Sequence, residues 1–224
     1  MQYGEHWGGP SSPPGGFITN IDAMVALSTP EDSGPGFWSD AQQLEICNFG
    51  EGNEFVGPDF PHGMTLEEYR SQYSIWAMFA SPLVLSADLR TVKQRHPDCL
   101  AMAMNRELLA VAMDPLGTAG KLIHQQTNLS SPVAAAVRSA NIVEQAWARP
   151  LSGGAVALCL FNRDEHPRNV TVSWAAAGLA APPQRVRDIW RFNSHGSDLA
   201  GPFGRSFSAM VPKHSVVMVR AEPK

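Results

Sequence analysis

One short stretch, "GPGFWSDAQQLEICNFG" at residues 34–50, gathers side chains that could bind or transform a ligand. Trp38 offers an aromatic face, Asp40 a carboxylate that can act as acid, base or acceptor, and Gln42 an amide that donates and accepts hydrogen bonds. A Gly-Pro-Gly sequence followed by an aspartate is also typical of a tight turn, where the carboxylate binds backbone amides. The stretch therefore predicts the rim of a site, the remains of one, or a turn before a buried strand.

The composition indicates a globular protein and argues against a nucleic-acid partner. The chain has 224 residues, enough for one large domain or two modest ones. Its 44% apolar and 17% charged residues are typical of a globular protein. The formal net charge is −4 and Lys and Arg form no run, so we expect no nucleic-acid partner.

Cysteine and histidine spacing predicts no metal site. Cys47, Cys99 and Cys159 lie far apart and form no Cys-x-x-Cys pair, and the histidines show no His-Glu-x-x-His spacing. One disulfide is compatible with three cysteines, and at least one thiol then stays unpaired. Cysteine usage therefore leaves the compartment open.

Membrane and secretion signals are weak. No segment holds the roughly 18 consecutive apolar residues that span a bilayer, so we expect no membrane partner. Residues 1–16 lack the basic end and apolar core of a signal peptide. Two Asn-x-Ser/Thr sequons begin at Asn128 and Asn169, and they carry a glycan only if the chain is secreted. The localisation stays unknown at this stage.

The elements that must position the stretch begin with a well-marked helix. In "MTLEEYRSQYSIWAMFA", Thr65 and Glu68 form a capping box, and an apolar stripe then recurs at steps of three and four. A shorter helix is expected at residues 21–27, a buried strand at "LVLSAD", residues 83–88, and short helices near 89–93 and 105–111. This alternation predicts a parallel α/β arrangement to about Gly117.

The pattern changes after residue 117. Short runs rich in Val and aromatic residues follow one another, separated by turn signals such as Ser-Gly-Gly at 152–154. Val170, Val172 and Trp174 alternate with polar neighbours, which predicts an antiparallel β-sandwich. We therefore predict two domains, residues 1–117 and residues 118–224.

Several blocks of sequence resemble glycoside hydrolase family 27, the α-galactosidases and α-N-acetylgalactosaminidases, also called melibiases. They are "GPGFWSDAQQLEICNFG", "MTLEEYRSQYSIWAMFASPLVLSADLR", "NRELLAVAMDPLGTAGK" and "VEQAWARPLSGGAVALCLFNR", in the family's order. The resemblance implies a fold that is α/β plus all-β: about the last three strand–helix units of a (β/α)₈ barrel, then the sandwich. Residues 2–7 look like the sixth barrel strand, residues 34–50 would carry the seventh and "PLVLSAD" the eighth. Strands one to five have no counterpart.

The resemblance also implies the chemistry. Retaining glycosidases use two carboxyl groups about 5–5.5 Å apart, one as nucleophile and one as acid/base, without metal or organic cofactor. The family's nucleophile lies in a Lys-Tyr-Asp-like motif, which this sequence does not contain. Its acid/base aspartate falls near Ser11 or Ser12 here, and a serine hydroxyl is no strong acid. We therefore predict no catalytic residue in the chain.

The substrate-binding candidates are Trp38, Asp40 and Gln42. The family usually reads Trp-Asn-Asp-Pro-Asp where this chain has Trp-Ser-Asp-Ala-Gln, so Asp40 keeps the first aspartate and Gln42 replaces the second. An amide still binds a hydroxyl but brings no charge. A turn role for Asp40 and a packing role for Trp38 are the favoured alternatives, and Asp88 is expected to cap the next helix.

The chain is thus predicted to be an α-galactosidase-like hydrolase, in a truncated or inactive form, that recognises an α-galactoside or a related carbohydrate. The alternatives are a non-catalytic carbohydrate- or partner-binding protein, an incomplete gene model or splice product of an intact enzyme, and one chain of a two-chain enzyme or homo-oligomer. Upstream sequence encoding Lys-x-Asp would distinguish the second of these. Galactose and N-acetylgalactosamine preference stays open.

Stability adds one expectation. A three-strand piece of a barrel leaves unpaired strand edges and an uncovered apolar face. We therefore expect an ordered carboxyl half and a poorly packed amino half, with the helix stripe at residues 66–79 short of partners.

Overall fold

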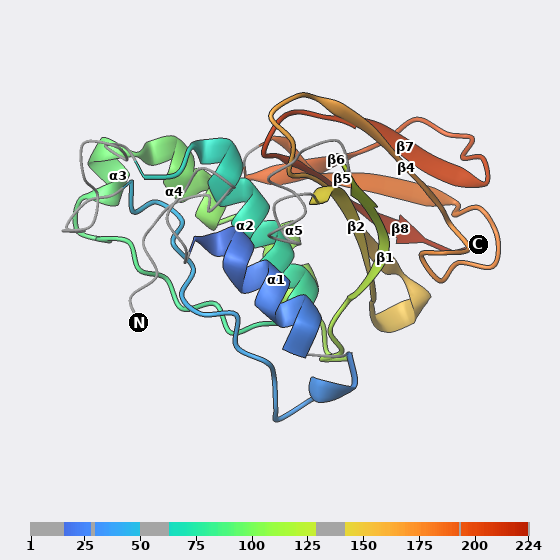
Figure 1. The fold of residues 1–224 in the computed structure, drawn as a ribbon, viewed down its shortest axis with the longest axis horizontal. Helices are drawn as coiled ribbons and strands as arrows, with labels where there is room; N and C mark the ends of the chain where they lie inside the picture. Colours follow the sequence, from blue (N-terminus) through green and yellow to red (C-terminus); the bar gives the residue numbers. More distant parts are fainter. Residues whose placement is uncertain (1–15, 28–29, 50–62, 129–141, 193, 224) are drawn as a thin grey trace.

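A layer of helices and two β-sheets make up the chain (Figure 1). The computed structural model describes residues 16–27, 30–49, 63–128, 142–192 and 194–223, and the element bounds below refer to these. The helices are α1 Phe17–Leu27, α2 Leu66–Phe79, α3 Val92–Arg95, α4 Pro97–Ala103 and α5 Arg106–Ala112. The strands are β1 Lys121–Thr127, β2 Ile142–Pro150, β3 Val156–Asn162, β4 Arg168–Ser173, β5 Arg185–Phe192, β6 His195–Asp198, β7 Ser206–Val211 and β8 Val216–Glu222.

The carboxyl-terminal part is the predicted antiparallel sandwich. One sheet has the strand order β1-β2-β3-β8-β5-β6, and β4 pairs with β7 in a second, smaller sheet. An apolar core lies between them, with Val170 and Val172 of β4 facing Leu158 and Leu160 of β3. The alternation read from the sequence therefore assigns these side chains correctly. Strands β1 and β6 were not predicted, since their residues are polar and short of Val.

The larger sheet is covered on both faces. Strand β3 is buried at every position, because Leu158 and Leu160 face the small sheet while Ala157, Cys159 and Phe161 face the helices. Figure 1 shows α1, α2 and α5 on one side of this sheet and β4 and β7 on the other. A strand that is covered on both faces has no solvent-facing positions for polar residues, which explains the continuous apolar run of β3.

For the described residues, the expectation of a poorly packed amino half is wrong. Eleven of the fourteen residues of α2 are buried, and its side chains share one apolar core with α1, α4 and α5 and with the large sheet. Trp76 contacts Phe17 at a ring-centroid distance of 6.4 Å, and Phe17 contacts Phe161 of β3 at 6.3 Å. The sandwich itself supplies the packing partner. The division at residues 117 and 118 stays a prediction.

The strand expected at residues 83–88 is reduced to a single parallel bridge. Leu44 pairs with Leu85: the Leu44 N–H donates to the Val84 carbonyl at 2.9 Å, and the Ser86 N–H donates to the Leu44 carbonyl at 3.1 Å. Val84 is 58% exposed, so the predicted burial is wrong there. Extended parallel pairing is typical of segments that are covered on both faces, and the exposed Val84 shows that this segment is open on one of them. The expected sixth strand, residues 2–7, lies outside the described residues.

The helix predictions hold more closely. The capping box is present: the Glu68 N–H donates to the Thr65 hydroxyl, and the Thr65 N–H donates to the Glu68 carboxylate at 2.7 Å. The helices expected at residues 21–27 and 105–111 correspond to α1 and α5. The sequence pattern did not predict α4 at residues 97–103.

Truncating Phe161 tests whether the two parts unfold together. Phe161→Ala should lower the free energy of unfolding by about 3–5 kcal/mol, because it opens a cavity in the core shared by helices and sheet. Phe192→Ala is the matched control: Phe192 is 52% exposed, and its loss should cost about 1 kcal/mol or less. Calorimetry should show one transition that moves as a whole. Two transitions, with only one displaced by Phe161→Ala, would contradict the shared core.

The helix cap predicts a loss of stability in acid. Burial alone would raise the pKa of Glu68, but hydrogen bonds with His214 and Thr65 outweigh it and hold the pKa below its ordinary value of 4.5. Because the folded-state pKa is the lower one, the stabilisation is complete above about pH 4.5 and is lost as the pH falls through the folded value. The difference in unfolding free energy between the wild type and Glu68→Gln should therefore shrink between pH 6 and pH 3. A difference that is constant with pH would refute the assignment.

Candidate functional site

The candidate site begins at the turn of residues 34–37. The Gly34 N–H donates to the Phe37 carbonyl at 2.8 Å, and the Phe37 N–H donates to the Gly34 carbonyl at 2.9 Å. Pro35 at the second position and Gly36 at the third, with φ +95°, are the residues that a type II turn requires. The turn predicted from the sequence is present, and it projects Phe37 and Trp38 to the surface.

Trp38 is anchored by the segment that leads into the sandwich. Its indole N–H donates to the Gly117 carbonyl at 3.1 Å, while 45% of the residue stays exposed. Gly117 has φ +63°, and a Cβ atom there would lie 3.0 Å from the Pro35 ring. A glycine is thus required where the two turns meet. The favoured packing role of Trp38 fits this geometry, although the residue stays partly exposed.

A buried arginine holds the Gly117 segment in turn. The Arg149 Nε donates to the Thr118 carbonyl at 2.9 Å, and its guanidinium also reaches the carbonyls of Ala77 and Ala112. Burial lowers the pKa of Arg149 to about 10, and Asp114 opposes the shift. Arg149 therefore stays charged at neutral pH and ties the ends of α2 and α5 to the Gly117–Thr118 segment, which accepts the Trp38 indole.

Asp40 and Gln42 form a small turn of their own. The Gln42 N–H donates to Asp40 Oδ1 at 2.9 Å, as the turn interpretation of Asp40 predicts. Gln42 has φ +78°, and its carbonyl accepts a hydrogen bond from the Trp76 indole at 2.9 Å. Both side chains are exposed, and this is the only hydrogen bond that Asp40 makes within the described residues. The second carboxylate oxygen and the Gln42 amide can therefore face a ligand, and substrate contact stays a prediction.

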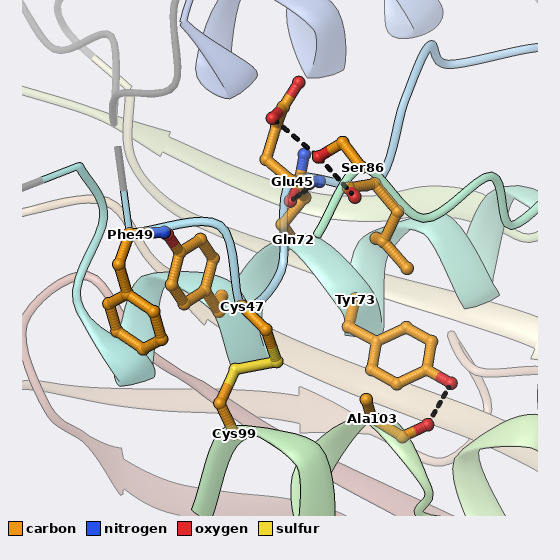
Figure 2. Close-up of a disulfide and its surroundings, with 10 residues drawn as sticks. Glu45, Cys47, Phe49, Gln72, Tyr73, Ser86, Cys99 and Ala103 are labelled. Atoms are coloured by element: carbon orange, nitrogen blue, oxygen red, sulfur yellow. Dashed lines mark hydrogen bonds between the residues drawn. A yellow bond between two sulfur atoms is a disulfide. The ribbon is translucent and has the colours of Figure 1, made fainter. Parts of the chain in front are cut away.

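The segment after Gln42 is fixed from two sides (Figure 2). The Glu45 N–H donates to the Gln72 side chain of α2 at 2.9 Å, and the Ser86 hydroxyl donates to the Glu45 carboxylate at 2.9 Å. Cys47 forms a disulfide with Cys99 of α4, across a Cα–Cα distance of 5.6 Å. Cys159 is the free thiol that the odd count required. The segment that carries the candidate residues is thus rigidly attached to α2 and α4.

Asp88 does not cap a helix, so that expectation is wrong. Its carboxylate pairs with Arg90, with Nε–Oδ1 and Nη2–Oδ2 distances of 2.9 Å, and these hydrogen bonds lower its pKa to about 2. Thr91 precedes α3 instead, without a side-chain cap. Asp88 Oδ1 also accepts the Arg90 backbone N–H at 3.0 Å, so the carboxylate closes a turn that precedes α3 instead of capping the helix itself.

Other kinds of site find little support. The part of the chain that the structure describes holds no cluster of three or more His, Cys, Asp or Glu residues suited to a metal ion. Within the same residues no helix is long and apolar enough to cross a membrane. A hollow of about 90 Å³ lies near Phe79, Leu122 and Trp147, well below the roughly 300–1,000 Å³ of common ligand pockets.

Sequence reasoning missed the residues that support the site. Ser81 accepts the Ala41 N–H at 2.9 Å, Gln72 holds Glu45, and Arg149 and Gly117 position Trp38. An arginine that follows the apolar Ala-Trp-Ala run of β2 was a signal for Arg149, and a glycine in a turn was one for Gly117. Neither signal names the partner, because the partners lie dozens of residues away in the chain.

Comparison with known proteins gives matches along both parts of the chain. The family model described as "Alpha galactosidase A" matches residues 18–114, and the one described as "Alpha galactosidase C-terminal beta sandwich domain" matches residues 144–221. "Alpha-galactosidase 3" of Arabidopsis thaliana is 34% identical over 193 residues, which is 86% of this chain and 37% of that protein. The alpha-galactosidase of Oryza sativa subsp. japonica is 31% identical over 93% of this chain and 43% of that protein.

Solved structures show the same fold. Alpha-galactosidase I from Mortierella vinacea superposes with a TM-score of 0.68 at 23% identity, over 93% of this chain and 45% of that one. The alpha-galactosidase of Saccharomyces cerevisiae gives a TM-score of 0.72 at 16% identity, over 93% and 52%. The described residues thus have the architecture of the end of a barrel glycosidase followed by its β-sandwich. The chain belongs to glycoside hydrolase family 27, the α-galactosidase or melibiase family, and spans roughly two fifths of the length of the curated relatives named here.

The contact between Gly117 and Pro35 predicts that alanine lowers the free energy of unfolding more at residue 117 than at another glycine with positive φ. Gly178→Ala, at φ +94° with open space around it, should cost about 1–2 kcal/mol for the backbone conformation alone. Gly117→Ala should cost at least about 1 kcal/mol more, because the new methyl group meets Pro35. The Trp38 indole N–H resonance should also lose its protection from exchange. Equal costs and an unchanged indole signal would show that the turns do not depend on each other.

Proposed function

We propose that this chain is the carboxyl-terminal part of an α-galactosidase-like glycoside hydrolase, an enzyme that cleaves terminal α-linked galactose with retention of configuration. The observation that carries the proposal is the match of both family models, in order, along one chain. The relatives are named alpha-galactosidases, and the Saccharomyces cerevisiae enzyme has been solved with raffinose, an α-galactoside.

Within that enzyme, Trp38, Asp40 and Gln42 would form one edge of the sugar pocket. Three features support this role: the side chains are exposed, they follow one another on two adjoining turns, and those turns are anchored to Gly117 and Trp76. A rigid mounting lowers the entropy lost on binding. The aromatic ring can stack on a sugar face, while the carboxylate and the amide accept or donate hydrogen bonds to hydroxyls.

The 224 residues by themselves would not hydrolyse a glycoside. Retention requires a nucleophile and an acid/base that face each other. This sequence lacks the family's Lys-Tyr-Asp-like nucleophile motif and has serine near the position of the acid/base aspartate. Catalysis would therefore need carboxyl groups from a longer form of the protein or from a complementing chain.

One observation favours a second candidate, a non-catalytic carbohydrate-binding protein. Gln42 stands where the family usually has a second aspartate. An amide can bind a hydroxyl but does not tune the pKa of a neighbouring acid. A protein that only binds its sugar would keep the exposed edge and tolerate this replacement.

Turnover and binding assays separate these functions. With an aryl α-galactoside, the purified chain should react at least about 10⁴-fold more slowly than a full-length family member, since each missing acid or base contributes about 10²–10⁴-fold. Hydrolysis that co-purifies with the chain and is absent from an Asp40→Ala preparation would overturn this expectation.

Calorimetry with galactose then tests the edge itself. Heat of binding that weakens in Trp38→Ala and survives in Phe192→Ala would support the carbohydrate-binding candidate. Asp40→Asn keeps an acceptor for the Gln42 N–H, so a loss of binding in that variant would assign the carboxylate charge to the ligand. Absence of any heat of binding would contradict the carbohydrate-binding candidate, because Trp38, Asp40 and Gln42 would then not bind galactose without the rest of the enzyme.

A further inference from the structure

We propose that Asn169 is an N-glycosylation site and that the chain matures in an oxidising secretory compartment. Two observations from different parts of the molecule carry this inference. One is the placement of the Asn169–Val170–Thr171 sequon on strand β4, and the other is the buried disulfide between Cys47 and Cys99.

Strand β4 presents the sequon outward. Asn169 and Thr171 are exposed, whereas Val170 between them and Val172 after them are buried in the sandwich core. The period of two in a strand therefore puts the acceptor amide and the required hydroxyl on the same solvent-facing side. Register confirms the placement, since Thr171 lies opposite Ser208 with their hydroxyl oxygens 2.7 Å apart.

The outer face of the small sheet has room for a glycan. Strands β4 and β7 form the outermost layer of the sandwich, with the large sheet behind them (Figure 1). Asn169 lies opposite Met210, which is 63% exposed. Within the described residues the Asn169 side chain makes no hydrogen bond, so attaching a sugar to it breaks none. A glycan there would also shield Met210 and hinder association through this two-stranded sheet.

The disulfide points independently to secretion. Cys47 and Cys99 are 5% and 1% exposed, and their backbones are held by the Leu44–Leu85 bridge on one side and by α4 on the other (Figure 2). Structural disulfides of this kind form in oxidising compartments and are rare where thiols are kept reduced. The enzymes that attach glycans to asparagine work in that same oxidising compartment.

Glycosylation of Asn169 is the transfer of an oligosaccharide from a donor molecule to the side-chain amide. The co-reactant is a lipid-diphosphate-linked oligosaccharide, supplied with its transferase by the cell. The bond between the anomeric carbon and the diphosphate oxygen breaks, and the lipid diphosphate leaves with the electron pair. The Asn169 amide nitrogen forms the new bond to the anomeric carbon and loses one proton to a base.

The second sequon provides an internal comparison. Asn128 follows strand β1, but the hydroxyl residue of its sequon, Ser130, lies outside the described residues. The structure therefore makes no case for Asn128. The proposal concerns Asn169, and the experiment has to locate the glycan rather than merely detect one.

The test uses the full chain, expressed in a eukaryotic host behind a cleavable signal sequence. Peptide N-glycosidase F converts each glycosylated asparagine to aspartate, which peptide mass mapping then locates. Asn169 should be converted in the wild type, in Asn128→Gln and in Thr171→Ser, which keeps the hydroxyl. Conversion at this site should be lost in Thr171→Ala. An unmodified Asn169 in secreted wild-type protein would overturn the proposal.

Two further measurements test the folded state. Peptide mapping without reductant should find Cys47 linked to Cys99 and Cys159 as a free thiol, and secreted protein with three free thiols would refute the oxidising route. Enzymatic removal of the glycan should change Tm by less than about 2 °C, because the site faces solvent. A wild type that is retained in the cell, while Asn169→Gln is secreted, would show that the strand does not tolerate the sugar.

Discussion

The buried guanidinium of Arg149 joins the parts of this structure. Burying a charge is unfavourable unless hydrogen bonds replace its hydration, and here the carbonyls of Ala77, Ala112 and Thr118 do so. Ala77 and Ala112 lie in the last turns of α2 and α5, where carbonyls lack helical partners and the helix dipole favours positive charge. The arginine thus allows two helix ends to be buried against the sheet that carries it.

Around this point, the large sheet serves two cores at once. Its residues alternate between the small sheet and the helices, so the same strand stabilises both. Charge pairs reinforce the helical side: Arg163 binds Asp22 of α1 with an Nη1–Oδ1 distance of 2.7 Å, and Arg187 binds Glu107 of α5 through two bonds. The helical part therefore has a packing partner within the chain, although parallel pairing among its described residues amounts to one bridge.

The same arrangement explains why the candidate edge is well defined. Trp38, Asp40 and Gln42 lie on turns, which by themselves would be loosely held. Gly117, Trp76 and the disulfide fix these turns to elements that the sandwich packs against. Such a mounting lets exposed side chains on turns keep their positions.

Local patterns in the sequence determined the capping box of α2, the tight turn at residues 34–37, the alternation in β4 and the family itself. Each of these depends on residues close together in the chain or on the order of motifs. The tertiary structure alone decided which face of β3 meets the helices, that Cys47 pairs with Cys99, and that Arg149 supports the turn at Gly117. It also decided that the segment around Leu85 forms a single parallel bridge, with Leu44, among the described residues, and that Asp88 binds Arg90. These outcomes depend on partners distant in sequence or on pairing between neighbouring charged side chains, and periodicity carries no information about either.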